Sequence, residues 1–209
     1  MAVRVLAVAD EVSESLEGDA LSELKPDLIV GCGDLPFEYL EYLVTRANVP
    51  LLYVPGNHDP ALRPPDPMWL GLTTAGAGVG AEGCVSVDGR IEEGAGLRVA
   101  GLGGSIRYRD GPNQYTQWQM RRRALKLEAR VRVGRRQVDI LVGHSPPAGI
   151  GDSDDPAHLG FTAFHRLVKQ LRPKVMFHGH VRYYGPPRAD QRIGDTLIVN
   201  AIPYRLIEI

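Results

Sequence analysis

Five short apolar runs in the sequence end in residues that can bind a metal or move a proton. Each run is rich in Val, Leu or Ile, as buried strands are, and each stops at Asp, Asn or His. The endings are Asp10, Asp34, the triplet Asn57-His58-Asp59, His144 and His180. Parallel strands bring their carboxyl ends to one edge of an α/β sheet, where such folds keep their sites. We therefore expect these endings to form a single site.

Four of these residues are typical ligands of a transition metal. Asp34 offers a carboxylate and Asn57 an amide oxygen, while His144 and His180 offer imidazoles. A mixed oxygen and nitrogen set suits Mn, Fe or Zn, whereas an all-oxygen set suits Mg or Ca. A metal bound there lowers the pKa of a water ligand and neutralises charge on a phosphoryl oxygen. Hydrolysis of a phosphate ester is the chemistry that this set serves most naturally.

The segments between these residues alternate strands with helices, which predicts a parallel sheet built by right-handed crossovers. The expected helices run from Ser13 to about Leu24, after Pro36, and from about Gly160 to Leu171. The expected strands are Val3–Ala9, Leu28–Gly31, Leu51–Val54, Asp139–Val142, Lys174–Phe177 and Thr196–Val199. A second sheet is expected to contain Cys84–Val87 and Leu97–Leu102. Tyr204–Ile209 forms a last strand, which could complete a sheet within the chain or across a homo-oligomer.

The composition indicates one compact domain. The chain has 209 residues, 44% of them hydrophobic, and we expect a single domain over residues 1–209. A formal net charge of −1 gives no global attraction to nucleic acid or to an anionic membrane. The two cysteines, Cys32 and Cys84, suggest neither a zinc knuckle nor a disulfide framework, which fits a reducing compartment. Neither a signal peptide nor a membrane-spanning run is visible, so we expect a cytoplasmic protein without a membrane partner.

One segment, from Gln114 to Val133, is strongly basic. Its positive charges are Arg121, Arg122, Arg123, Lys126, Arg130 and Arg132. A solvated helix face is the expected explanation, and a nucleic-acid face is the alternative, which the neighbouring Tyr115 and Trp118 support weakly. We therefore expect a small phosphate ester rather than a long nucleic acid as the substrate.

The order of the strand-end residues resembles that of the calcineurin-like metallophosphoesterase family. The five blocks of that family are D-x-H, G-D, G-N-H-D/E, G-H and G-H-x-H. The corresponding segments here are Asp10-Glu11-Val12, Gly33-Asp34, Gly56-Asn57-His58-Asp59, Gly143-His144 and Gly179-His180-Val181-Arg182. The resemblance covers residues 10–182. It implies an α/β fold, namely a four-layer αββα sandwich of two mixed β-sheets flanked by helices.

The resemblance also implies a role for each matched residue. The metal ligands that it implies are Asp10, Asp34, Asn57, His144 and His180. In that scheme Asp10 holds a first metal, Asp34 bridges two metals, and the other ligands hold the second metal. His58 protonates the leaving group or stabilises the charged phosphoryl group, and Asp59 holds the ring of His58. The implied reaction is attack of a metal-bound hydroxide on a phosphate monoester or diester.

Two departures from the family pattern fall on ligands of the same metal. Val12 and Arg182 stand where the family has His, whereas every ligand of the second metal is kept. This pattern leads to the hypothesis of one tightly held metal, with the Arg182 guanidinium near the vacated position. There Arg182 would offset the charges of Asp10 and Asp34, or bind a substrate phosphate in a bidentate pair.

Other roles stay open for several of these residues. A first metal could still bind through Asp10, Asp34, water and either His178 or an aspartate of the Asp152–Asp155 loop, so that one or two metals are expected per chain. Asp10 could instead form a salt bridge with Arg182. We otherwise expect His178 to support the site without binding the metal.

Residues on the substrate side are predicted from a glycine bend at Gly103-Gly104. Arg107, Tyr108 and Tyr115 are the candidates for substrate binding, Asn113 could line the same pocket, and a plain surface loop is the alternative. His158 and His165 are expected to be structural.

Two functions of different classes follow from these residues. The first is a metal-dependent phosphoesterase in which His58, Asp59 and Arg182 are catalytic. The second is a binding or scaffold protein that keeps the fold after losing catalysis, which the altered first metal site supports.

Overall fold

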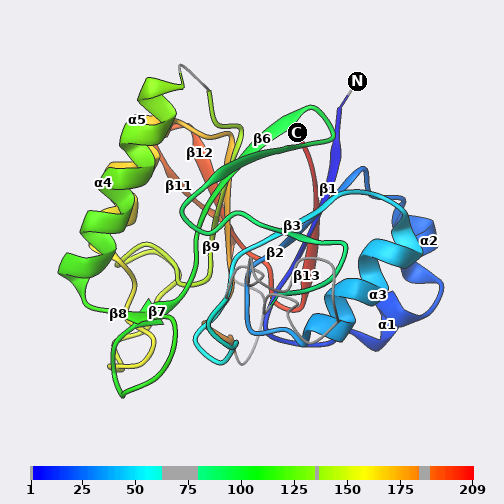
Figure 1. Ribbon diagram of the computed structural model, residues 1–209, viewed down its shortest axis with the longest axis horizontal. Helices are drawn as coiled ribbons and strands as arrows, with labels where there is room; N and C mark the ends of the chain where they lie inside the picture. The colour runs from blue at the N-terminus through cyan, green and yellow to red at the C-terminus, as the bar shows by residue number, and fades with distance from the viewer. Residues whose placement is uncertain (1, 63–79, 135–136, 184–188) are drawn as a thin grey trace, which may run out of the picture.

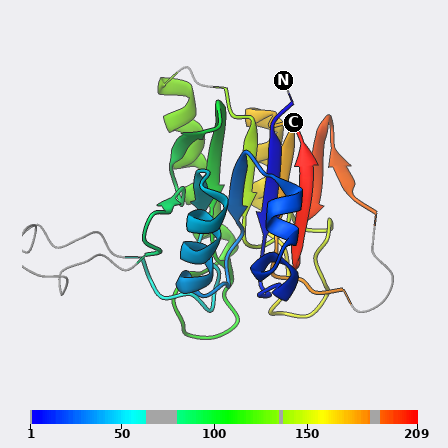
Figure 2. The ribbon, with the colours of Figure 1, turned by 90° about the vertical axis from the view of Figure 1, so that its right-hand side faces the viewer.

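Two mixed β-sheets lie face to face, and helices cover the outer face of each sheet (Figure 1). The computed structural model describes residues 2–62, 80–134, 137–183 and 189–209. Within these ranges the layers follow one another as helices, sheet, sheet and helices, and Figure 2 shows the strands of both sheets lying nearly along one axis. The expected α/β fold class, a four-layer αββα sandwich, is confirmed.

The first sheet carries the strand ends nearest the N-terminus. Its strands are β1 (Arg4–Val8), β2 (Leu28–Gly31), β3 (Leu51–Tyr53), β4 (Val85–Ser86) and β13 (Tyr204–Glu208), in the order β13-β1-β2-β3-β4. Strands β1 to β4 run parallel, while β13 is antiparallel to β1. Val5 of β1 pairs with Leu28 on one side and with Ile207 on the other. The last strand therefore completes a sheet within the chain.

The second sheet carries the remaining strand ends. Its strands are β5 (Ile91–Gly94), β6 (Leu97–Leu102), β9 (Ile140–Gly143), β10 (Val175–His178), β11 (Gln191–Ile193) and β12 (Thr196–Asn200), in the order β11-β12-β10-β9-β6-β5. The four inner strands are parallel, and both edge strands are antiparallel to their neighbours. A separate parallel ribbon joins β7 (Ser105–Ile106) to β8 (Gln114–Tyr115).

The helices divide between the two outer faces. The first sheet is covered by α1 (Glu14–Glu17), α2 (Ala20–Leu24) and α3 (Phe37–Ala47), and the second by α4 (Gln117–Val133) and α5 (Thr162–Leu171). Helix α4 begins with a capping box, because the Thr116 hydroxyl accepts from the Gln119 amide at 3.2 Å and the Gln119 side chain accepts from the Thr116 amide at 2.8 Å. Among the described residues, no helix combines the length and apolar character needed to cross a bilayer.

The strands are buried on both faces, which explains their continuous apolar runs. Along β1, Val5 and Ala7 point into the layer between the two sheets, while Leu6 and Val8 pack against the helices of the first sheet. Met120 of α4 and Phe164 of α5 fill the layer outside the second sheet. Each fully buried side chain of this size contributes about 1.5–3 kcal/mol to stability. Packing of this kind fixes where every strand ends.

Two expectations are corrected by the structure. Cys84–Val87 is expected from the sequence in the second sheet, but its strand β4 pairs with β3 of the first sheet, where Val85 lies opposite Leu52. The helix expected from Ser13 to about Leu24 is two short helices, because the backbone leaves helical geometry at Gly18. The basic segment contains strand β8 and then helix α4, which starts at Gln117.

Candidate metal centre

The predicted metal ligands come from both sheets. Asp34 and Asn57 follow strands β2 and β3 of the first sheet, while His144 and His180 follow β9 and β10 of the second. Ligand atoms of Asp34, His144 and His180 all lie within 4.8 Å of one another. Asn57 joins them, since its Oδ1 atom lies 3.0 Å from the Nε2 atom of His144. We refer to these four residues as the His144 cluster.

His144 is the residue at the centre of this cluster. Its ring is fully buried, and its Nδ1 atom lies 2.8 Å from the carbonyl oxygen of Cys32. Because a carbonyl can only accept, Nδ1 carries the hydrogen, and Nε2 faces the cluster. Nε2 there meets two oxygens, Asn57 Oδ1 at 3.0 Å and Asp34 Oδ2 at 3.3 Å. Lone pairs that converge in this way require a cation among them, either a proton on Nε2 or a metal ion.

The protonation of this centre follows from its charges. Burial alone would lower the pKa of His144, but the hydrogen bond and the negative charge of Asp34, with a contribution from Asp10, raise it to about 9. Burial raises the pKa of Asp34, but His144 and the amide of His58 more than offset that effect and hold it below its ordinary value. Without a metal, a proton on His144 balances the Asp34 carboxylate. A divalent metal fits the same place, because its ligands are one carboxylate, one amide oxygen and imidazoles.

His180 enters the cluster through a bent backbone. Its φ angle is +69°, and its amide donates to Asp10 Oδ2 at 2.8 Å. Its Nε2 atom lies 2.8 Å from the carbonyl oxygen of Ala157, which leaves Nδ1 as the nitrogen with a free lone pair. Burial and the neighbouring charge of His144 lower the pKa of His180 to about 3, so its ring is neutral and can bind a metal.

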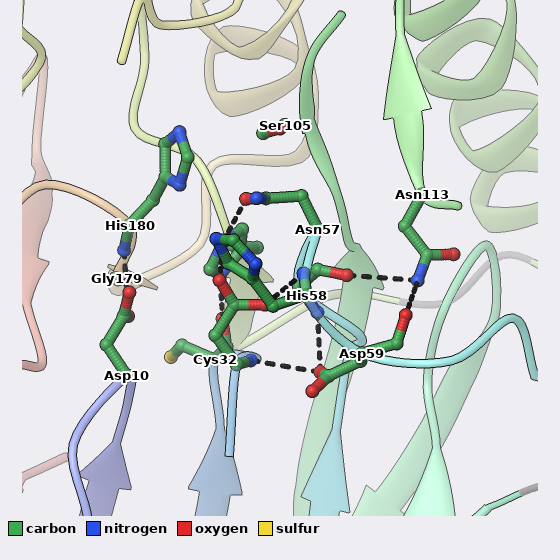
Figure 3. A network of polar contacts seen from close by, with 12 residues as sticks. Asp10, Cys32, Asn57, His58, Asp59, Ser105, Asn113, Gly179 and His180 are labelled. Atoms are coloured by element: carbon green, nitrogen blue, oxygen red, sulfur yellow. Dashed lines mark hydrogen bonds and ion pairs between the residues drawn. The ribbon is translucent and has the colours of Figure 1, made fainter. Parts of the chain in front are cut away.

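Asp10 contacts the turn at His180 and is not part of the His144 cluster. Among the described His, Cys, Asp and Glu residues, the group within 4.8 Å contains Asp34 and the two histidines but not Asp10. The Asp10 carboxylate lies against Gly179, where a Cβ atom would overlap its Oδ2 atom. Burial, as the largest cause, raises the pKa of Asp10 to about 6. Figure 3 shows Asp10 beneath Gly179 and His180.

Arg182 and Val12 occupy the rim. The Arg182 Nε atom lies 3.2 Å from Glu11 Oε1, and its Nη2 atom donates to the backbone oxygen of Asp10 at 3.2 Å. The salt bridge considered between Asp10 and Arg182 is therefore formed by Glu11 instead, and Asp10 contributes only its carbonyl. Val12 is 44% exposed. Arg182 still borders the same cleft as Asp10 and Asp34.

The carboxylate of Asp59 is bonded to the backbone of two site turns. Its Oδ2 atom accepts from the amides of Gly56 at 2.8 Å and Asp34 at 2.9 Å (Figure 3). The family resemblance implies that it holds the ring of His58, but its hydrogen bonds go to these amides. His58 itself is exposed, and its Nδ1 atom lies 3.5 Å from Nη2 of Arg109.

Of the residues predicted for substrate binding, Tyr108 lies at the site. The Nδ2 atom of Asn57 donates to the Tyr108 hydroxyl at 3.4 Å, and Tyr108 borders the cleft. Arg107 donates to the carbonyl of Gln114 at 3.4 Å, and the ring of Tyr115 lies 4.2 Å from the Arg123 guanidinium. Arg107 and Tyr115 thus make their contacts within and beside the β7–β8 ribbon.

Two residues make contacts at the site that differ from those expected from the sequence, where Asn113 is a candidate to line a substrate pocket. His158 is expected to be structural, but its ring lies 5.0 Å from that of His180, and Asp155 Oδ2 lies 2.6 Å from its Nδ1 atom. The side chain of Asn113 donates to the carbonyls of Gly56 at 3.0 Å and Asp59 at 3.1 Å. The three-residue spacing of Asp155 and His158 is a local signal, but nothing in the sequence near Asn113 indicates its long-range partners.

The other two histidines lie outside the cluster. His165 contacts the carbonyl oxygen of Ala148 at 2.6 Å, in keeping with a structural role. His178 is buried with its Nδ1 atom 3.0 Å from the carbonyl oxygen of Gly179, and burial lowers its pKa to about 4.

The cleft above the His144 cluster has a volume of about 650 Å³. We call it the metal cleft, and its lining residues are Asp10, Asp34, Asn57, His58, Tyr108, Ser153, Asp155, Ala157, His158, His180, Val181 and Arg182. A cleft of this size holds a small organic molecule. His58 and Tyr108 come from the loops after β3 and β7, whereas Asp155 and His158 come from the loop after β9. A phosphate group in the cleft would meet imidazoles from both sides.

The chain is similar to known proteins in sequence pattern and in fold. A family model for calcineurin-like phosphoesterases matches residues 6–183. No curated protein matches the chain. One solved structure aligns with a TM-score of 0.64 at 18% identity, over 100% of this chain and 95% of that one.

Two further solved structures are similar in fold. The protein TT1561 of Thermus thermophilus aligns with a TM-score of 0.60 at 18% identity, over 96% of this chain and 89% of that one. GAP50, described as the anchor in the inner membrane complex of Plasmodium, aligns with a TM-score of 0.51 at 12% identity, over 96% and 72% of the two chains. At such low identity, these similarities show the fold alone.

Proposed function

Because the chain belongs to the calcineurin-like phosphoesterase family, we propose that it hydrolyses a phosphate monoester or diester with a divalent transition metal bound at the His144 cluster. The observation that carries this proposal is the direction of the His144 ring. Nδ1 is bonded to the Cys32 carbonyl, so Nε2 is aimed at the oxygens of Asn57 and Asp34. Imidazoles that bind metals are oriented in this way by a backbone or carboxylate acceptor on the other nitrogen.

A bound metal would supply a nucleophilic water and neutralise charge on a phosphoryl oxygen. The protein's own groups then act on the rest of the ester. His58 is exposed at the rim and close to Arg109, where it can donate a proton to the leaving oxygen. Arg182 borders the cleft and can donate to a phosphate oxygen. His158, held by Asp155, offers a further donor from the opposite wall.

We also propose that a single metal is held tightly. Asp10 is bonded to the His180 amide, Val12 is exposed, and Arg182 pairs with Glu11. Val12 offers no ligand atom, and Asp10 and Arg182 already have partners within the chain, which supports the loss of a first metal site. Mn, Fe and Zn are all compatible with the ligand set.

A scaffold function is the second candidate, and the Arg182 ion pair with Glu11 favours it. A protein without catalysis would use the cleft for an anion or a partner. Binding of long nucleic acid has less support. Arg123 is bound to Asp88 and Arg132 to Glu128, while Arg122 stacks on Trp118, so part of the basic charge of α4 is used within the chain. A cytoplasmic location stays a prediction.

The test combines metal content with turnover. Protein purified without chelator would be assayed for metal and for hydrolysis of p-nitrophenyl phosphate and bis-p-nitrophenyl phosphate with Mn added. We expect one metal per chain and turnover that falls in His58→Ala. The double variant Val12→His/Arg182→His is the matched test of metal number, and we expect it to gain a second metal. Bound metal without turnover would favour the scaffold function, and absence of bound metal would overturn the metal site.

A further inference from the structure

A second pocket lies beside the metal cleft. Its volume is about 440 Å³, and Val181 and Arg182 line both spaces. Its apolar lining includes Ile150, Ile198, Ile202 and Pro203. Pockets of this size hold small organic groups. A molecule that places its phosphate beside Arg182 therefore has room for a ring-sized group in this pocket.

The charged groups around the second pocket are already paired. Arg205 donates to Asp190 at 2.8 Å, and Arg182 lies 3.2 Å from Glu11. Asn200 is also satisfied, because its amide donates to the Val181 carbonyl at 2.8 Å and accepts from the Ile202 amide at 3.0 Å. The pocket therefore has little to offer a charged ligand.

His178 is a polar residue that lines this pocket and has one ring nitrogen without a hydrogen-bond partner within the described ranges. Its side chain is 2% exposed and lines the pocket, and its Nδ1 atom contacts the Gly179 carbonyl at 3.0 Å. Because that carbonyl accepts, Nδ1 donates and Nε2 is the acceptor of the neutral ring. In the described part of the chain, no hydrogen bond reaches Nε2. Because Nε2 is not one of the buried side-chain atoms without a partner among the described residues, it is open to the pocket, and a donor from a ligand can bond to it there.

Gly151 keeps the space in front of Nε2 open. Its φ angle is +77°, and a Cβ atom on it would stand 3.1 Å from both His178 Nε2 and the Tyr183 hydroxyl oxygen. The Tyr183 hydroxyl donates to the Gly151 carbonyl at 2.8 Å, which fixes this wall. The glycine thus leaves a gap of atomic size on the side from which a donor would approach the histidine.

We propose that this second pocket binds the alcohol part of the phosphate ester, an uncharged ring-sized group that donates one hydrogen bond to His178 Nε2. The proposal rests on the proposed function, because it assumes that the phosphate lies in the metal cleft. The substrates are then phosphate esters of heteroaromatic or hydroxylated ring alcohols. His178 is then a specificity-determining residue, and Arg182 lies between the two parts of the substrate.

The experiment measures binding of a ring without any phosphate. Chelator-treated full-length protein would be titrated with indole, which has one N–H donor, and with N-methylindole, which has the same ring without the donor. We expect indole to bind about tenfold more tightly, as the net contribution of one hydrogen bond provides. Equal binding of the two rings, or binding of neither, would overturn the proposal.

Two variants and a control locate the site. In His178→Asn, the amide nitrogen can still donate to the Gly179 carbonyl, but Nε2 is removed, so the preference for indole should disappear. In Ile150→Trp, the added ring should fill the pocket and weaken both ligands about tenfold. Val133→Trp adds the same ring to an exposed position of α4 and should bind like wild type. A preference that survives in His178→Asn would place the indole elsewhere and refute the assignment.

Activity assays separate this proposal from the proposed function. Hydrolysis of p-nitrophenyl phosphate without indole binding would overturn the second pocket and leave the phosphoesterase standing. Indole binding that follows the predicted pattern, without hydrolysis of any ester, would keep the ring site and overturn catalysis. With both present, kcat/KM for indoxyl phosphate relative to naphthyl phosphate should fall about tenfold in His178→Asn.

Discussion

The Nε2 atom of His144 lies 3.3 Å from Asp34 Oδ2, while the other nitrogen of the same ring is bonded to the backbone of Cys32. One nitrogen of the imidazole is therefore fixed and the other is available to a proton or a metal. The two cations compete for the same lone pair. This relationship governs how the protein should respond to pH and to metal removal.

Metal uptake should release a proton. The pKa of His144 in the metal-free fold is raised from 6.5 to about 9, so below this range Nε2 is protonated and a metal must displace that proton. We expect about one proton released per metal near pH 7, and apparent affinity that rises about tenfold per pH unit up to the pKa of His144. Calorimetric titrations in buffers of different ionisation enthalpy would measure the release, and an enthalpy independent of buffer would contradict it.

The metal-free protein should lose stability at alkaline pH. Because the folded-state pKa of His144 lies above the value of 6.5, its ion pair with Asp34 is fully present below that value. The contribution is lost as the pH rises through about 9. Urea unfolding of chelator-treated protein from neutral to alkaline pH would show this decline. His144→Gln should flatten the decline, and an equally steep fall in that variant would assign it to another group.

Replacement of Gly56 by Ala should damage the metal site. A Cβ atom there would overlap Asp34 Oδ1, so the Asp34 carboxylate has to move. We expect a loss of about 2–4 kcal/mol in the free energy of unfolding and much weaker metal binding. Gly194→Ala is the matched control, because nothing lies within 4 Å of its Cβ position and its φ of +60° costs about 1 kcal/mol. Similar metal content in both variants would refute the expectation.

Asp59 should act through the backbone rather than through His58. Asp59→Asn keeps an oxygen for the amides of Gly56 and Asp34, so we expect turnover within about threefold of wild type. Asp59→Ala removes the acceptor and should lower the unfolding free energy by about 2–4 kcal/mol, because one buried and one partly buried amide lose their partner. Thermal unfolding and kcat together test this. If Asp59→Asn loses as much activity as His58→Ala, the carboxylate charge acts on catalysis after all.

His158 should contribute to turnover without holding the metal. It lies beside His180 and is oriented by Asp155, and donors of this kind contribute about 10²–10⁴-fold at most. We expect His158→Ala to lower kcat by about tenfold with unchanged metal content, and His58→Ala to lower it further. His165→Ala, which changes a histidine of α5 outside the cleft, is the control. Loss of the metal in His158→Ala would instead identify His158 as a ligand.

The grouping of the strand-end residues could be predicted because each one follows an apolar run and a change in backbone direction. Asp34, Asn57, His144 and His180 share this pattern, and the structure brings them together. The partners of Asp59 could not be predicted, since nearly every residue has a backbone amide and nothing in the sequence marks two of them. The place of His158 at the cleft could not be predicted either, because it depends on the path of the loop that carries it. The sheet to which β4 belongs could not be predicted, because this strand pairs with β3 through two residues, which is too short for a periodic pattern.

The first and last strands carry a consequence for engineering the chain. Val3 and Ile209 exchange two backbone hydrogen bonds of 3.0 Å, at the opposite end of β1 from Asp10, and Figure 1 shows the two chain ends close together there. A short peptide could join them and allow the chain to be opened at a surface loop. A label or surface tether attached at this end would likewise leave the substrate approach unobstructed.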